Sequence, residues 1–419
     1  SHTITGIGDG DVFDNSTALN ASLVTDDQRA GLYIFGQNRH RSAYDHDGDG
    51  YSEIPKLHGQ TIGFRSFLKT TTYSKLTFEY HHMEEFRRGG DLLNRPPHEA
   101  NVAEQTEHSI NGGGLKFDYF SPNENHRFNV FASAQHINRD SYYGPGDRDP
   151  LDAYGNTTDL NWMAGSQYVY SFGKCIFMPS DLTAGIEFNQ DKLEDNMWGY
   201  NRTVDQKVNI GSAFLQNEWK NDHWGFLIGG RLDKHNLIDH VIFSPRANLR
   251  YNPTENINLR FSYSSGFRAP QAFDEDLHVE NVGGNVAMVE LADNLKEERS
   301  QSLSASADIY HRFGAFQVNF LVEGFYTKLS DVFALTDGEV VDGILTRTRH
   351  NASGAQVLGL TLEGKMAYLN KIQVQAGVTL QQSHYSKPHI WNKEAPAVKK
   401  MMRTPNTYGY FTATYTPIK

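Results

Sequence analysis

The sequence lacks the features that mark several large classes of protein. It holds a single cysteine, Cys175, which excludes a disulfide framework and a multi-cysteine metal site. No stretch of it approaches the ~20 consecutive apolar residues that a membrane-spanning helix needs. The formal net charge of -11 argues against nucleic acid as a partner, because proteins that bind nucleic acid present basic surfaces.

Two further absences concern domain organisation and catalysis. No linker, composition shift or block of charge marks a domain boundary, so residues 1–419 are predicted to form one domain. The sequence shows no HExxH motif, no Cys–His pair and no Ser, His and Asp in a catalytic order, so we expect no enzymatic activity. The first residues lack the basic and apolar regions of a signal peptide, which a mature or truncated start explains.

What the sequence has in quantity is alternation of apolar and polar residues. Leu76, Phe78 and Tyr80, for example, alternate with Lys75 and Glu79. We count roughly 17 such segments of ~9–14 residues, and a tilted strand needs ~9–11 residues to cross a membrane. The pattern predicts an all-β fold, a transmembrane antiparallel β-barrel with apolar side chains toward lipid and polar ones toward the lumen. The residues predicted to face lipid include Leu76, Phe78, Leu259, Phe261, Phe316, Val318, Leu358 and Leu360.

The connections between these segments also alternate in length. Tight turns, such as those at 26–27 and 221–222, follow every second segment. Long connections are predicted at 42–56, 84–107, 140–157, 194–205, 269–298, 331–353 and 384–404. Short turns on one side and long loops on the other are typical of outer-membrane barrels. Since such barrels have an even number of strands, the odd count predicts a fragment, incomplete at both ends, of a barrel of about 22 strands.

The sharpest local motif lies in the first long connection. Asp45, Asp47 and Asp49 occupy alternate positions, and Gly48 and Gly50 allow a sharp turn. This is the spacing with which an EF-hand loop wraps Ca²⁺, although no helices flank it and its twelfth position is not the usual glutamate. The alternative is a solvated acidic loop. The predicted Ca²⁺ ligands are Asp45, Asp47, Asp49, the carbonyl of Tyr51, and Glu53.

Other residues of the long connections are candidates for contact with a substrate. They are aromatic, charged or histidine residues: Phe86, Arg87, Arg88, Tyr142, Tyr143, Asp147, Asp149 and His278. Aromatic rings also gather at membrane interfaces for reasons unrelated to a ligand, and a histidine in a loop is more often a plain polar residue. Both interpretations remain open for these positions.

Two short stretches carry a resemblance to a known family. Phe267, Arg268, Ala269 and Pro270 close one predicted strand, and a second stretch with Asn294, Leu295, Glu298 and Ser300 opens the next. Together they resemble the paired boxes of the TonB-dependent outer-membrane transporters, although both prolines of the second box are missing here. The resemblance implies an outer-membrane location, and energy from the TonB-ExbB-ExbD motor acting through a plug domain that these residues do not include.

The acidic first loop resembles receptors of the Bacteroidetes cobalamin type, in which calcium-binding aspartates order the substrate site. The resemblance therefore implies uptake of a scarce metal chelate, cobalamin in the first place, with a ferric siderophore or haem as alternatives. It also implies Ca²⁺ as a possible cofactor and a surface lipoprotein as a possible partner. From another class, a non-transporting surface receptor or adhesin stays open. A general porin fits less well than a barrel of about 22 strands, because porins have ~16–18 strands and lack the two boxes.

Overall fold

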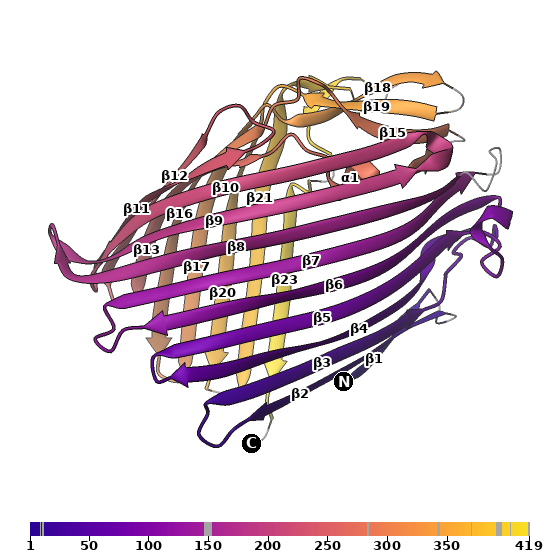
Figure 1. The fold of residues 1–419 in the computed structure, drawn as a ribbon. Helices are drawn as coiled ribbons and strands as arrows, with labels where there is room; N and C mark the ends of the chain where they lie inside the picture. The colour runs from indigo at the N-terminus through magenta and orange to yellow at the C-terminus, as the bar shows by residue number, and fades with distance from the viewer. Residues whose placement is uncertain are drawn as a thin grey trace.

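The chain forms one large curved sheet in a computed structural model that describes residues 1–8, 10, 12–145, 153–282, 285–341, 344–369, 371–390, 396–402 and 404–417 (Figure 1). This sheet has 19 strands, and all its pairings are antiparallel. Its strands are β1 (His2–Ile7), β2 (Val12–Val24), β3 (Ala30–Arg41), β4 (Ser52–Thr71), β5 (Ser74–Gly90), β6 (Val102–Phe120), β7 (His126–Pro145), β8 (Tyr154–Cys175), β9 (Met178–Met197), β10 (Arg202–Lys220), β11 (Trp224–His235), β12 (Ile242–Thr254), β13 (Ile257–Arg268), β16 (Glu298–Phe313), β17 (Phe316–Ser330), β20 (Ala355–Tyr368), β21 (Ile372–His389), β22 (Val398–Lys400) and β23 (Thr407–Tyr415). The predicted all-β antiparallel architecture is confirmed.

The order of strands around the wall follows the order of the chain. Each strand from β1 to β13 pairs with the next, and the wall continues through β16, β17, β20 and β21. Both β22 and β23 pair with the edge of β21 that β20 leaves free, so the 19 strands occupy eighteen positions. The sequence-based count of about 17 was therefore slightly low. In the described residues β1 pairs only with β2 and β23 only with β21, so the wall is open between them.

The register collects apolar side chains in lateral rows on one face of the wall. Phe261 on β13 lies opposite Leu249 on β12 and opposite Ala305 on β16. Residues directly opposed in an antiparallel pair point to the same face, so such rows form a continuous apolar band. Arg260 and Arg250, opposed in the neighbouring row, point to the other face. Of the eight residues predicted to face lipid, none belongs to a buried cluster of the described structure, and six are exposed: Phe78, Leu259, Phe261, Phe316, Leu358 and Leu360.

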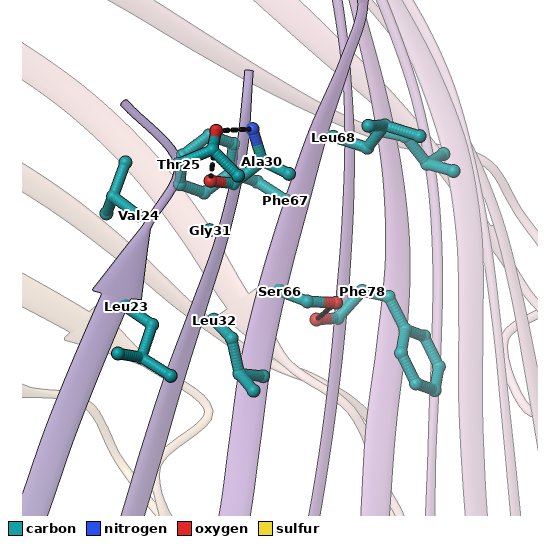
Figure 2. Close-up of a pocket in the computed structure, with 11 residues that line it drawn as sticks. Leu23, Val24, Thr25, Ala30, Gly31, Leu32, Ser66, Phe67, Leu68 and Phe78 are labelled. Carbon is teal, nitrogen blue, oxygen red and sulfur yellow. Dashed lines mark hydrogen bonds between the residues drawn. The ribbon is translucent and has the colours of Figure 1, made fainter. Parts of the chain in front are cut away.

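The apolar band begins directly beside the tight turns, as Figure 2 shows for the turn between β2 and β3. The Thr25 hydroxyl accepts the Ala30 N–H (3.1 Å) and lies 3.2 Å from the Ala30 carbonyl oxygen, which closes the turn. Leu23, Leu32 and Phe78 then lie on one face around a shallow hollow of about 470 Å³. An aliphatic surface of this kind matches the acyl chains of a membrane.

The strands on one side of the wall are much longer than a membrane requires. The strands from β4 to β10 have 17 to 22 residues, so they continue well past the apolar band. About half of each long connection predicted at 84–107 and 140–157 is therefore strand, and the one predicted at 194–205 shrinks to residues 198–201. The alternation fades there because outward residues such as Glu107 and Asp140 are polar too, while the backbone ladder persists.

A second sheet of four strands lies at the end of the wall that carries the long connections (Figure 1). Its pairing of β15 with β19 is parallel, a departure from the wholly antiparallel expectation. Its strands are β14 (Glu280–Val282), β15 (Asn285–Leu291), β18 (Phe333–Val341) and β19 (Ile344–Asn351). The short helices at this end are α1 (Asp274–Leu277), η1 (Pro97–Glu99) and η3 (Trp198–Tyr200). Within the described residues, no helix combines the length and apolar character needed to cross a membrane.

Candidate functional site

The connection between β13 and β16, residues 269–297, folds against the inner face of the wall. It carries α1, β14 and β15, of which β14 contacts β7. Val279 and Met288 from this connection join Tyr143 and Met197 from the wall in a buried apolar cluster. Tyr143 and Met197 point away from the apolar band by their place in the register. The connection therefore lines the mouth of the lumen.

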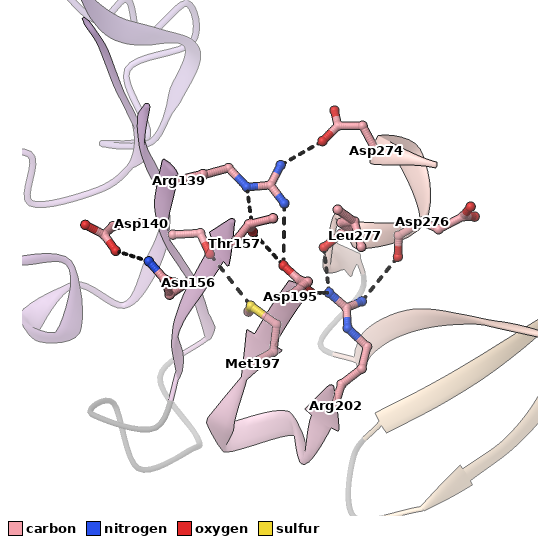
Figure 3. A network of polar contacts seen from close by, with 11 residues as sticks. Arg139, Asp140, Asn156, Thr157, Asp195, Met197, Arg202, Asp274, Asp276 and Leu277 are labelled. Carbon is pink, nitrogen blue, oxygen red and sulfur yellow. Dashed lines mark hydrogen bonds and ion pairs between the residues drawn. The ribbon is translucent and has the colours of Figure 1, made fainter. Parts of the chain in front are cut away.

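Beneath α1, three polar residues form one row across neighbouring strands. Arg139 on β7 lies opposite Thr157 on β8, and Thr157 lies opposite Asp195 on β9. The Arg139 Nε donates to Thr157 Oγ1 at 3.1 Å, and Thr157 Oγ1 donates to Asp195 Oδ1 at 2.6 Å (Figure 3). Asp140, which follows Arg139 in the chain, lies opposite Glu107 and points outward. Arg139 therefore faces the lumen, and so do Thr157 and Asp195, which lie opposite it in the same row.

A second arginine joins this row to the inserted connection. Arg202, the first residue of β10, donates from Nη2 to Asp195 Oδ2 at 2.9 Å. It also donates to the main-chain carbonyls of Asp276, at 3.2 Å, and Leu277, at 2.8 Å (Figure 3). Asp195 is fully buried and both arginines are 7% exposed. Buried charges persist only when they are paired, so Asp195 holds Arg139 and Arg202 together.

The three consecutive acids of α1 each bind an arginine. Asp274 lies 2.8 Å from Arg139, and Asp276 lies 2.6 Å from Arg349 on β19. Glu275 lies 2.7 Å from Arg268 and 3.0 Å from Arg349. α1 therefore connects the wall, the end of β13 and the second sheet through ion pairs.

Burial and charge act in opposite directions on two of these acids. Burial raises the pKa of Asp276, against the hydrogen bond from the Phe273 N–H and the charge of Arg349. The hydrogen bond from Arg268 lowers the pKa of Glu275, helped by a second one from Arg349 and opposed by burial. Glu275 is thus held ionised by two guanidinium groups, whereas the Phe273 N–H and Arg349 only partly offset the effect of burial on the pKa of Asp276.

Five of the eight residues predicted as substrate contacts lie on strands rather than in loops, so the predicted placement was wrong for these five. Phe86, Arg87 and Arg88 belong to β5, and Tyr142 and Tyr143 belong to β7. Because neighbours on a strand point to opposite faces, Arg87 and Tyr143 face the lumen, and Phe86, Arg88 and Tyr142 face outward. The structure therefore divides this set between the two faces of the wall.

Of the remaining predicted contacts, His278 lies in the mouth. Its ring packs edge-on against Tyr143 at 5.1 Å between centroids, and its Nδ1 lies 3.8 Å from Glu104 Oε1. Burial raises the pKa of Tyr143 to about 12. Asp147 and Asp149 lie outside the described residues.

The two boxes of the sequence resemblance meet as paired strands. Arg268 at the end of β13 lies opposite Glu298 at the start of β16, and Phe267 lies opposite Arg299. The Arg268 guanidinium stacks over the Phe273 ring at 4.0 Å, which fixes it beneath α1. The other box residues lie close to this pair of strands. Ala269 is buried beside Ile238, and Ser300 lies within β16. Pro270, Asn294 and Leu295 lie in the connection between β13 and β16.

The acidic loop between β3 and β4 brings its four carboxylates together. One oxygen from each of Asp45, Asp47, Asp49 and Glu53 lies within 4.8 Å of the others. Asp45 accepts the backbone N–H groups of residues 48 and 50 at 2.7 and 2.9 Å, where both glycines have positive φ. The Tyr51 N–H donates to Asp49 at 2.8 Å. This donor set of carboxylate oxygens fits a hard cation such as Ca²⁺.

Sequence reasoning missed the residues that hold α1 in the mouth. Arg139, Asp195, Arg202 and Arg349 were not singled out, because each contacts at least one residue that is far away in the chain. The run of three acids at 274–276 was the available signal. Extending the alternation of β7 and β9 past the apolar band would also have assigned Arg139 and Asp195 to the lumen face.

Comparison with known proteins assigns this architecture to a family. Residues 5–418 match the family model described as TonB dependent receptor-like, beta-barrel. The chain belongs to this family. It is a family of receptor barrels and not a class of enzymes. No curated protein matches the sequence.

Solved structures share the fold of this receptor barrel at low sequence identity. The siderophore receptor PirA of Acinetobacter baumannii has a TM-score of 0.72 at 15% identity, over 92% of this chain and 62% of that one. A mutant of the ferric enterobactin receptor PfeA of Pseudomonas aeruginosa has a TM-score of 0.72 at 12% identity, over 100% and 72%. The alcaligin receptor FauA of Bordetella pertussis has a TM-score of 0.63 at 13% identity, over 97% and 63%. The chain thus spans 62% of the length of PirA from A. baumannii.

Removing the shared carboxylate should destabilise the mouth of the receptor barrel. We expect Asp195→Ala to cost about 3–5 kcal/mol, because it leaves two buried arginines without their common partner. Asp140→Asn, on the outward face beside Arg139, should cost under about 1 kcal/mol. Denaturant unfolding in detergent, together with proteolysis of the 269–297 connection, measures both. Equal stability of the two variants would contradict the assigned role of Asp195.

Proposed function

We propose that this receptor barrel belongs to a TonB-dependent transporter that imports a metal chelate across a Gram-negative outer membrane. The observation that carries the proposal is the combination of family membership with a polar mouth built from charged side chains. An apolar band outside and a charged lining inside suit a wall between lipid and a water-filled passage. Energy would come from the TonB-ExbB-ExbD system.

Among chelates, we propose a ferric siderophore as the substrate. The similar structures named above are siderophore receptors by description, and the arginines of the mouth suit a ligand that is rich in oxygen acceptors. Cobalamin, which the acidic first loop suggested, is the alternative that the same experiment resolves. Haem is a third chelate in the comparison, because His278 lies in the mouth.

Uptake by cells tests the proposal. The complete gene would be expressed in a Gram-negative strain that lacks its own siderophore, haem and cobalamin receptors. Cells would receive radiolabelled ferric siderophores, haem or cobalamin, with the TonB system active or deleted. We expect uptake of a ferric siderophore that depends on TonB.

Each outcome of the uptake experiment has a distinct meaning. TonB-dependent uptake of cobalamin or haem alone would replace the siderophore while keeping the transporter. Binding without uptake would contradict transport and favour a surface receptor. Uptake that is independent of TonB would contradict energised transport and indicate passive diffusion.

We also propose that the loop at residues 42–51, with Glu53 of β4, binds Ca²⁺ and that the bound ion orders this loop. Without a cation, carboxylates a few Å apart near a surface repel each other by about 1–4 kcal/mol per pair. Asp45, Asp47 and Asp49 would hold the ion together with Glu53, whose second function is to accept the His46 N–H at 2.5 Å. An ordered loop would then raise the affinity for the substrate.

Substrate titration with and without a calcium chelator tests this site. In the parent protein, chelation should weaken substrate binding, and Asp47→Ala should weaken it to the same extent whether or not Ca²⁺ is present. Asp26→Ala, in an exposed tight turn at the other end of the wall, is the matched control and should behave as the parent does. Equal affinities in all conditions would reduce the motif to a solvated acidic loop.

A further inference from the structure

The ion pairs beneath α1 point to a specific mode of substrate recognition, which rests on the transport function proposed above. We propose that Arg139 and Arg268 bind the anionic oxygens of a metal chelate, and that Asp274 and Glu275 are tethered competitors for the same guanidinium groups. The acidic turn occupies the positions on Arg139 and Arg268 that the chelate takes when it binds.

The two pairs are built for exchange, because their acidic members are open to water. The Asp274 side chain is 88% exposed although its partner Arg139 is 8% exposed. The Glu275 side chain is 56% exposed and Arg268 is 39% exposed. Ion pairs with an exposed member contribute little net stability, so a ligand can replace the carboxylate at small cost.

The third acid differs, and it explains how α1 stays attached when the other two are displaced. Asp276 and Arg349 are 3% and 7% exposed, and their closest atoms lie 2.6 Å apart. The main-chain carbonyls of Asp276 and Leu277 also accept hydrogen bonds from Arg202. Breaking a buried pair of this kind is costly. Asp276 is therefore the anchor, while the exposed Asp274 and Glu275 can be displaced.

Several buried polar atoms around α1 lack a hydrogen-bond partner in the described structure. They are the donors Nε of Arg202 and Nε and Nη1 of Arg349, and the acceptor Oδ1 of Asp276, so the donors left without a partner outnumber the acceptors. A buried donor without an acceptor costs free energy, so this part of the mouth gains from a ligand with additional oxygens. A ferric tris-catecholate, which is anionic and presents several oxygens around the metal, has that chemistry. A neutral ferric tris-hydroxamate lacks the charge.

Binding of these two probes to the purified full-length receptor tests the proposal. The variant with Asp274→Asn and Glu275→Gln should bind the anionic tris-catecholate roughly three- to tenfold more tightly than the parent, because its competitors are gone. Its affinity for the neutral tris-hydroxamate should stay within about twofold. Tryptophan fluorescence quenching measures both affinities.

Hydrogen exchange gives a second measurement. Its expected result would not be seen if Asp274 and Glu275 had a purely structural role. Addition of the anionic probe to the parent should speed amide exchange at residues 273–277, because the turn is displaced. A loop that simply closes over the ligand would instead become protected. Protection of α1 would therefore overturn the displacement.

A matched control separates competition from a general change in charge. Glu194→Gln removes a negative charge on β9 next to Asp195 in the chain but on the outward face, where Glu194 contacts Lys192. It should leave the affinity for the anionic probe as in the parent.

Three results would overturn the proposal. They are an equal gain in affinity in this control, an equal gain for the neutral probe, and no gain in the double variant. If the parent binds both probes and the double variant matches it, only the competition fails; if the parent binds neither chelate, the siderophore proposal fails with it.

Discussion

Every backbone amide and carbonyl that enters the hydrocarbon layer needs a hydrogen-bond partner on a neighbouring strand, because lipid offers none. The continuous ladders from β1 to β21 satisfy this requirement through the apolar band, except at the two edges of the wall, where β1 and β23 have no second neighbour in the described residues. The same ladders fix the register, and the register decides which side chains meet lipid and which meet water. Rows such as Leu249 and Phe261 outside, and Arg250 and Arg260 inside, follow directly from it.

Beyond the apolar band, the same ladders carry a different kind of surface. The strands from β4 to β10 continue with water on both faces, and their inner face becomes a platform for the connection at 269–297. Here the stabilising contacts are a buried apolar cluster around Tyr143 and a set of ion pairs centred on Asp195. Buried ion pairs contribute little net stability but require a defined geometry, so they position α1. The exposed acids of α1, Asp274 and Glu275, remain free to exchange their arginine partners with a ligand.

The architecture could be predicted from alternation because the period of a strand is a local property of the sequence. The paired boxes could be recognised, but their contact through Arg268 and Glu298 could not, since about thirty residues separate them. The predicted loop residues Phe86 and Tyr142 were misplaced because alternation no longer marks a strand when both faces are wet. The pairs of Arg139 with Asp274 and Arg349 with Asp276 join distant segments, and no local pattern encodes such contacts.

The central claim is that one face of the wall meets lipid and the other meets water. It is tested most directly by Phe261→Cys and Ser262→Cys, adjacent on β13, in a Cys175→Ser background and in bilayers. With a fluorophore at each cysteine, the account predicts quenching by brominated lipid acyl chains at 261 and by a water-soluble quencher at 262. The same quenching profile at both positions, or quenching at 261 by the aqueous agent alone, would contradict it.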